Sequence, residues 1–317
     1  MARLTLLSDP HLSPTHGFFW DNWRVACDAV NAEKPDLVVI AGDLCINGPD
    51  SDAEMEFAGA ALKAIEVPVR AIPGNHDVGD EPPGQTSEQL IDAARLARWN
   101  GVFGSDRFDM RFGAWHLIGI NAQLCGSGLP EDGGQRHWLA ERLAQAEGPV
   151  ALFLHKPLFL DSPEEATPTA ASLNLAPRAE LMKLIKSAPV RLVVSGHLHS
   201  HRDVIHDGVR YVWAPALSFL HTAHSGSTPM VAALSLDLSS QAPGIDIVPI
   251  PGLVAHDLAE MKGHGRYAFL RDLPACPPMG APGLALVCHR GDVRAGSPRS
   301  DKGPALLGPR ASRPRSQ

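Results

Sequence analysis

The sequence has no closely spaced pair of cysteines. Its five cysteines are scattered, odd in number and free of any C-x-x-C motif. A zinc ribbon needs such pairs, and a secreted disulfide framework needs an even set of cysteines at regular spacing. Neither is indicated, and a reducing compartment fits this usage best, so we expect a cytoplasmic protein.

Long apolar runs are missing as well. No stretch of the chain is long enough to span a bilayer. We also expect no signal peptide, because a β-rich run begins at Arg3 and the first polar candidate for a site is already Asp9. The sequence therefore predicts no membrane partner.

The chain as a whole lacks an excess of positive charge. Its formal net charge is −7, and residues 262–317 hold ten Lys or Arg against three Asp, so residues 1–261 carry −14. Nucleic-acid binding relies on basic side chains that neutralise phosphates, so we expect no nucleic-acid partner. Residues 262–317 also hold 16 Gly or Pro and no sustained periodicity, a composition typical of disorder. We expect one folded domain over 1–261 and a disordered basic tail over 262–317.

No internal repeat is visible, and the order of elements predicts an α/β fold. Strands alternate with helices early, which predicts parallel βαβ units, and strands gather after residue 200, which predicts an added antiparallel sheet. The expected helices cover residues 20–33, 52–65, 86–99, 135–146 and 177–187. The second of them opens on a capping box from Ser51 to Glu54. Hairpins are expected over 107–121, turning at Gly113, and over 203–213, turning at Asp207-Gly208.

Five apolar strands each stop at polar residues. They cover residues 3–8, 36–41, 67–72, 150–154 and 190–195. The residues that follow them are Asp9-Pro10-His11, Gly42-Asp43, Gly74-Asn75-His76-Asp77, His155 and Gly196-His197-Leu198-His199. Because parallel strands place their carboxyl ends on one side of a sheet, we expect these clusters to converge.

The converging side chains suit a pair of metal ions. Two Asp, one Asn and four His offer more oxygen and nitrogen donors than one ion needs, and they suit two octahedral-type ions that share a carboxylate. No thiolate is among them, which argues against a structural zinc site. We expect two divalent or trivalent ions, and Fe, Mn, Zn and Co all fit these ligands.

In their order, the five clusters resemble the calcineurin-like metallophosphoesterases. The pattern of that family runs Asp-x-His, Gly-Asp, Gly-Asn-His-(Asp/Glu), His, Gly-His-x-His, and every block is present between residues 9 and 199. The resemblance implies a four-layer α/β/β/α sandwich with two mixed β-sheets. It also implies that residues 1–261 form a catalytic domain that hydrolyses phosphoric esters.

The resemblance assigns a role to each residue. Asp9, His11 and His199 would hold the first metal, and Asn75, His155 and His197 the second. Asp43 would bridge the two ions. His76 would be the non-ligand histidine near the leaving group. Apart from the resemblance, the adjacent carboxylate of Asp77 is expected either to orient this histidine or to favour its charged form.

Elementary chemistry supports this assignment. Phosphate esters resist hydrolysis because their anionic phosphoryl group repels hydroxide. Two adjacent cations offset that charge, lower the pKa of a shared water and align it for in-line attack. The leaving oxygen still needs a proton, which a histidine such as His76 can supply.

Two blocks point to a branch of the family. Leu7 to Leu12 and Gly74 to Asp80 look most like class III cyclic nucleotide phosphodiesterases and their glycerophosphodiesterase relatives, and the Asp-Arg-Gly segment of Ser/Thr protein phosphatases is absent. A small phosphodiester is the implied substrate. Lys156 departs from the pattern, since many relatives carry a second histidine there. We expect this lysine to face either substrate phosphate or solvent.

Alternatives stay open at this point. A nuclease or a phosphomonoesterase could use the same site, and a non-catalytic scaffold could use the same fold. The acidic catalytic region argues against a nuclease, and the complete ligand set argues against a scaffold. The oligomeric state is open, and a homodimer is compatible with the sequence.

Overall fold

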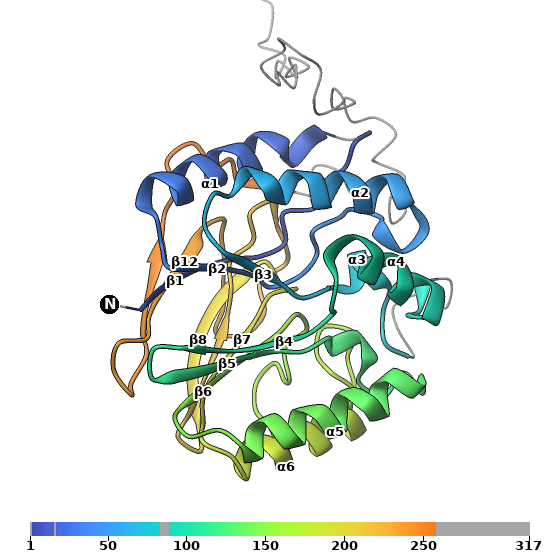
Figure 1. Cartoon of the computed structure of the whole chain (residues 1–317), viewed down its shortest axis with the longest axis vertical. Coiled ribbons are helices and arrows are strands. Elements are labelled where there is room, and N and C mark those ends of the chain that lie inside the picture. The colour runs from blue at the N-terminus through green and yellow to red at the C-terminus, as the bar shows by residue number, and fades with distance from the viewer. Residues whose placement is uncertain (1, 16, 83–88, 258–317) are drawn as a thin grey trace, which may run out of the picture.

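Two β-sheets lie face to face between two layers of helices (Figure 1). The computed structural model describes residues 2–15, 17–82 and 89–257. From the top of Figure 1, the layers are helices α1 (Trp20–Glu33) and α2 (Asp52–Ala61), the first sheet, the second sheet, and helices α5 (Pro130–Ala144) and α6 (Leu175–Lys186). The expected four-layer architecture with two mixed sheets is confirmed. The expected tail, 262–317, lies outside the described residues.

The first sheet has the strand order β13-β12-β1-β2-β3. Strands β1 (Arg3–Leu7), β2 (Leu37–Ile40) and β3 (Val69–Ala71) are parallel. The late strand β12 (Ala233–Asp237) pairs antiparallel with β1, and β13 (Gly244–Val248) pairs antiparallel with β12. The first sheet thus combines strands from both ends of the described chain.

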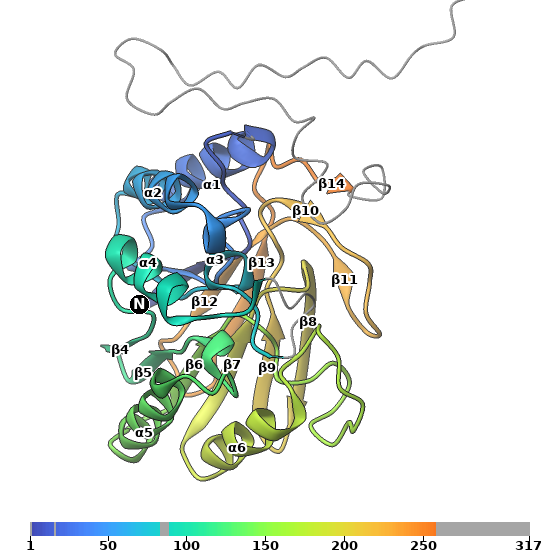
Figure 2. The same cartoon turned by 90° about the vertical axis from the view of Figure 1, so that its right-hand side faces the viewer.

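The second sheet has the strand order β11-β8-β9-β7-β6-β5-β4. Its parallel centre contains β5 (Trp115–Gly119), β6 (Val150–Leu154), β7 (Val190–Ser195) and β9 (Val209–Trp213). Antiparallel strands flank it: β4 (Phe108–Phe112) on one side, and β8 (Ser200–His206) and β11 (Thr228–Pro229) on the other. A short parallel pair, β10 (Phe219–Leu220) with β14 (His256–Asp257), lies apart from both sheets (Figure 2).

The late strands do not form the separate antiparallel sheet that the sequence predicts. Instead β8 and β9 extend the second sheet, and β12 and β13 return to the first. The reason is burial: Leu234 and Leu236 of β12 are fully buried between the sheets, where they gain more than they would in a solvent-facing sheet.

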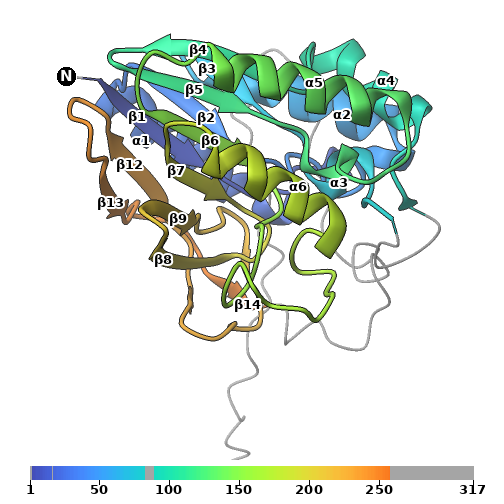
Figure 3. The same ribbon diagram turned by 90° about the horizontal axis from the view of Figure 1, so that it is seen from below.

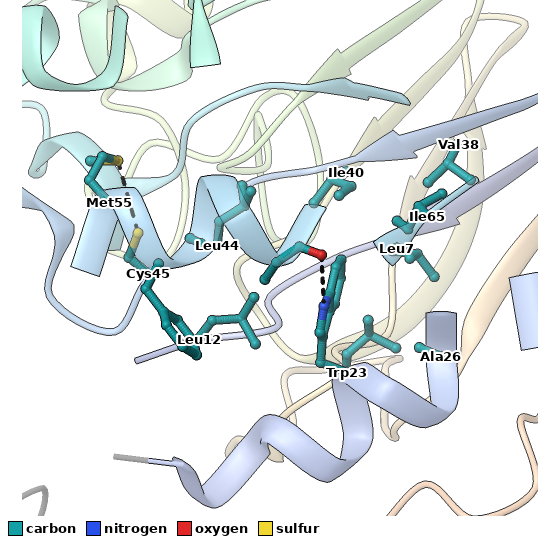
Figure 4. Packing of buried hydrophobic residues seen from close by; sticks show 14 of the residues in the cluster. Leu7, Leu12, Trp23, Ala26, Val38, Ile40, Leu44, Cys45, Met55 and Ile65 are labelled. Atoms are coloured by element: carbon teal, nitrogen blue, oxygen red, sulfur yellow. Dashed lines mark hydrogen bonds between the residues drawn. The ribbon is translucent and has the colours of Figure 1, made fainter. Parts of the chain in front are cut away.

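Strand alternation divides the core into three parts. In β2, Leu37 and Val39 pack between the sheets, whereas Val38 and Ile40 pack against the first helix layer. Figure 4 shows part of the latter cluster, where Trp23 donates a hydrogen bond to the carbonyl of Ala61. The third part lies under α5 and α6, which cross the second sheet in Figure 3. Strands β1, β2, β6 and β7 are therefore covered on both faces, which explains their continuous apolar sequence.

Strand β3 differs from the buried strand that was expected. It is the edge of the first sheet and pairs only with β2. Arg70 is exposed, Val69 and Ala71 are half-buried, and only Ile72 beyond the strand is fully buried. A charged side chain on an edge strand discourages pairing with a second chain.

Several helix boundaries differ from those expected, although α1 spans its predicted residues. Helix α2 ends at Ala61, and Leu62–Ala64 continue as a 3-10 turn. Helix α4 spans Ala93–Phe103, and its N-cap is Asp92, whose side chain accepts the backbone N–H of Arg95. The helix was expected to start at residue 86, and residues 83–88 lie outside the described part. Helices α5 and α6 begin earlier than expected, at Pro130 and Leu175, because proline fits the first turn of a helix.

None of the helices in the described ranges combines the length and the apolarity that a membrane crossing requires.

Candidate metal centre

The structure brings all seven predicted ligands together. Asp9, Asp43 and Asn75 follow β1, β2 and β3 of the first sheet, and His155 and His197 follow β6 and β7 of the second. Six of these side chains and His76 form three overlapping groups: Asp9, His11 and His199; His11, Asp43 and His76; and Asp43, His155 and His197. Within each group the donor atoms all lie within 4.8 Å of one another. The seventh, Asn75, places its Oδ1 3.2 Å from Nε2 of His155. The site therefore lies where the carboxyl ends of both sheets meet.

Five of the seven predicted ligands have a left-handed backbone. The φ angles are 53° at Asp9, 48° at His11, 53° at Asp43, 73° at His197 and 50° at His199. Few residues other than glycine adopt this region, and such conformations gather at functional sites, where the surrounding structure enforces them. The chain turns sharply at each ligand so that the side chain points at the cluster.

Two glycines keep the backbone close to the ligands. Gly42 has φ 94°, and a Cβ there would lie 2.5 Å from Nδ1 of His155. A Cβ on Gly74 would lie 2.1 Å from Oδ1 of Asp43. Any side chain at either position would displace a predicted ligand.

The first group surrounds His199. Its Nε2 lies 3.3 Å from Nε2 of His11 and 3.4 Å from Oδ1 of Asp9. On the other side of the ring, Nδ1 lies 2.7 Å from the carbonyl oxygen of Phe219 and donates to it. A histidine that donates one N–H to a carbonyl presents the lone pair of its other nitrogen to a metal.

The second group is built in the same way around His155. Nδ1 of His155 donates to the carbonyl oxygen of Ala41 at 2.7 Å. Its Nε2 lies 3.2 Å from Oδ1 of Asn75 and 3.2 Å from Oδ2 of Asp43. The His197 ring lies 5.1 Å from the His155 ring, centroid to centroid.

Asp43 belongs to both sides of the cluster. Its Oδ2 lies 3.2 Å from His155 and 3.8 Å from His11, and its Oδ1 accepts the backbone N–H of His76 at 2.8 Å. A carboxylate between two sets of imidazoles is the arrangement that a bridged pair of ions requires.

Electrostatics favour the ligand forms of most of these groups. Burial alone would raise the pKa of Asp43, but His155 and His76 hold that pKa well below its usual range. Burial, and then the neighbouring His76, lower the pKa of His11. Burial, and then Lys156, lower the pKa of His197. Burial also opposes a charge on His155, yet Asp43 raises its pKa to about 9. A metal at this position therefore has to displace a proton from His155.

Asp77 connects two backbone segments of the site. Its buried carboxylate accepts backbone N–H groups from Leu44 at 3.2 Å, Cys45 at 2.9 Å and Gly74 at 2.9 Å. Burial, and then Asp43, raise the pKa of Asp77 to about 7. The Asp77 carboxylate therefore connects the segment after β2 to the segment after β3. Nδ1 of His76 donates to the carbonyl of Ile46 at 2.8 Å.

Lys156 faces neither solvent nor an open site. It is 1% exposed, and its Nζ lies 2.8 Å from both carboxylate oxygens of Glu81. No sequence pattern pointed to Glu81 as this partner, because the two residues are 75 positions apart. No pattern pointed to two other residues at the site, Phe219 and Gln123.

Comparisons with known proteins agree with this geometry. The family model described as calcineurin-like phosphoesterase matches residues 2–201. A Danio rerio protein named serine/threonine-protein phosphatase CPPED1 is 32% identical over 208 residues, covering 61% of this chain and 64% of that relative. A Fibrobacter succinogenes protein named probable cyclic nucleotide phosphodiesterase is 26% identical over 218 residues, covering 67% of this chain and 78% of that relative.

A solved structure shares the fold. The structure of a dimetal phosphatase from Danio rerio matches with a TM-score of 0.54 and 15% identity, and the match covers 77% of this chain and 95% of that one. The curated relatives are longer than the matched region, since the first of them is matched over 64% of its length.

Proposed function

Because the chain belongs to the calcineurin-like phosphoesterase family, we propose that it hydrolyses phosphoric esters with two metal ions at the cluster around Asp43. The observation that carries the proposal is the shared carboxylate of Asp43, which stands between His11 on one side and His155 on the other. Together with the further ligands Asp9 and His199 on one side and Asn75 and His197 on the other, this arrangement supplies enough donors for two ions that share Asp43.

The donor set fits a pair of ions. His155 and His199 each donate Nδ1–H to a carbonyl, which leaves Nε2 to face the cluster. Asp9, His11 and His199 would hold one ion, Asn75, His155 and His197 the other, and Asp43 both. Two ions there would neutralise phosphoryl charge and acidify a water for in-line attack. Their identity among Fe, Mn, Zn and Co is not fixed by these ligands.

His76 would serve the leaving group. With Nδ1 committed to the carbonyl of Ile46, Nε2 is the nitrogen that can pass a proton to the leaving oxygen. Its ring stands edge-on to His11, with centroids 4.6 Å apart, and it lies within 4.8 Å of donor atoms of His11 and Asp43. We assign it to the leaving group because the other seven side chains already supply ligands for two ions.

A small phosphodiester of the cyclic nucleotide or glycerophosphodiester type is the substrate class we favour. The blocks at residues 7–12 and 74–80 support it, as does the relative named probable cyclic nucleotide phosphodiesterase. The relative named serine/threonine-protein phosphatase supports a second candidate, hydrolysis of a phosphomonoester. The two candidates differ in substrate and share the same residues.

Alanine at the bridging or the amide ligand should abolish activity. We expect Asp43→Ala and Asn75→Ala each to reduce hydrolysis of bis(p-nitrophenyl) phosphate by more than the 10- to 100-fold typical of residues outside the ligand set. Circular dichroism should show folded proteins. Wild-type rates in both variants would overturn the proposal.

A substrate panel separates the two candidates. The wild-type chain would be assayed with Mn²⁺, Zn²⁺, Fe²⁺ and Co²⁺ on a cyclic nucleotide and a glycerophosphodiester, and on a nucleoside monophosphate and glycerol phosphate as monoesters that also have alkoxide leaving groups. Faster turnover of the two diesters supports the first candidate. Faster turnover of the two monoesters supports the second.

A further inference from the structure

Lys156 forms a buried ion pair directly beside a predicted ligand. It follows His155 in sequence, its Nζ lies 2.8 Å from both oxygens of Glu81, and it also lies 3.6 Å from Oδ1 of Asp80. All three side chains are at most 2% exposed. A buried ion pair stabilises a fold no better than apolar residues of the same size, because both charges lose their hydration. Its position beside the metal centre suggests another use.

Glu81 leads from Lys156 to a second predicted ligand. Gln123 lies fully buried in a 3-10 turn, Ala122–Leu124, after β5. With its amide oriented so that nitrogen faces acceptors and oxygen faces donors, Gln123 donates to Oε2 of Glu81 at 2.7 Å and accepts the backbone N–H of Asn75 at 2.8 Å. Asn75 in turn lies 3.2 Å from His155.

These contacts close a ring. It runs from His155 through the chain to Lys156, then to Glu81, Gln123 and Asn75, and back to His155. Asn75 follows the first sheet and His155 the second, so no shared strand fixes one against the other. His155 also donates to the carbonyl of Ala41 after β2, and the ring adds a connection to Asn75 itself. Within the ring, Lys156 offsets the charge of Glu81 at 2.8 Å, and it lies 3.6 Å from the carboxylate of Asp80.

We propose that Lys156 is a positioning residue for the second metal ion: through Glu81 and Gln123 it holds Asn75 against His155. This inference rests on the two-ion site of the proposed function. On this inference Lys156 acts without contacting the substrate, and Glu81 and Gln123 transmit its effect to Asn75.

Two variants interrupt the ring at different points. Lys156→Met removes the ion pair, and Gln123→Met breaks the link to Asn75 while the ion pair remains. The probe is Mn²⁺ alone, added to the full-length chain. Equilibrium dialysis counts the bound ions and their affinities, and electron paramagnetic resonance detects the coupled Mn²⁺ pair. We expect the wild type to bind two ions.

We expect both variants to keep the first ion at wild-type affinity and to bind the second 10- to 100-fold more weakly, with loss of the coupled signal at concentrations that saturate the wild type. Leu181→Ala, in the core under α6, is the control for a general loss of stability and should keep both ions. If Lys156→Met does not fold, Gln123→Met still decides. Wild-type affinity for the second ion in Gln123→Met, or equal weakening in Leu181→Ala, would overturn the inference. A wild type that binds one ion would overturn the proposed function itself.

Discussion

His76 is held from two directions. Its backbone N–H donates to Asp43 and its Nδ1–H donates to Ile46, both at 2.8 Å. The ring is therefore fixed relative to the predicted bridging ligand before any substrate arrives. If His76 donates the proton as proposed, a ring held this firmly is suited to one leaving-group position.

The effect of losing His76 should depend on the leaving group. We expect His76→Ala to slow hydrolysis of an ester with an alkoxide leaving group by about 10²- to 10⁴-fold, the usual contribution of a general acid. Hydrolysis of bis(p-nitrophenyl) phosphate should suffer much less, because p-nitrophenolate departs without a proton. Steady-state kcat on the two substrates measures the difference, and equal losses on both would argue for a structural role of His76.

Residue types and their order predicted which side chains converge, because each polar cluster follows an apolar strand and the strands share a direction. Their assignment as metal ligands stays a prediction. The partners that orient the ligands were not predictable. Asp77 binds three backbone N–H groups that only the fold brings near it, and Lys156 meets Glu81 across 75 residues of sequence.

Helix α2 begins with half of a capping box. Ser51 Oγ accepts the backbone N–H of Glu54 at 3.2 Å, as expected, but the Glu54 carboxylate does not reach back to Ser51. It accepts from Ser13 Oγ at 2.5 Å and from the amides of Ile46 and Asn47 at 3.2 and 3.1 Å. The start of α2 thus holds the two segments that follow Asp9 and Asp43.

The cap should contribute stability without affecting the metal centre. We expect Ser51→Ala to lower the free energy of unfolding by about 1 kcal/mol, the typical cost of losing an N-cap side chain. Urea unfolding measures it, with Ser51→Thr as the matched control that keeps a cap. A loss of bound Mn²⁺ in Ser51→Ala would contradict the prediction that the Ser51 cap stabilises the helix without affecting the metal centre.

Periodicity predicted the type of most elements and the limits of α1, β6, β7 and β9. It did not predict which sheet the late strands join. Strands β8 and β12 are both short and partly apolar, so their sequences do not show which sheet each one joins. Strand β12 joins the first sheet beside β1, and β8 joins the second beside β9. The predicted starts of α5 and α6 were wrong, and a proline stands in the first turn of each helix.

The candidate metal centre takes its residues from both sheets. The first sheet supplies Asp9, Asp43 and Asn75, and the second supplies His155 and His197. Between these sheets lies an apolar core that includes Leu6, Val39 and Phe153. Bound ions would add a second connection between the sheets at their carboxyl edges.

Metal removal should therefore reduce the stability of the entire domain. A ligand at a free concentration of 100 times its dissociation constant adds about 2.7 kcal/mol per site to the free energy of unfolding. We expect Mn²⁺ to raise the midpoint of thermal unfolding in the wild type and a chelator to reverse the change, as measured by calorimetry. Asp43→Ala should not respond, and a response of wild-type size would mean that the ions bind elsewhere.

The placement of β12 beside β1 bears on the time course of folding. Residues 233–237 must pair with residues 3–7 before the first sheet is complete, and long-range pairings of this kind form slowly. We expect the predicted ligands of the two sheets to meet only after that step, and the ions therefore to bind late. We expect Mn²⁺ to slow unfolding while leaving the refolding rate unchanged, as stopped-flow kinetics in urea can test. On this view the ions govern how long the folded chain lasts and have no part in how quickly it forms.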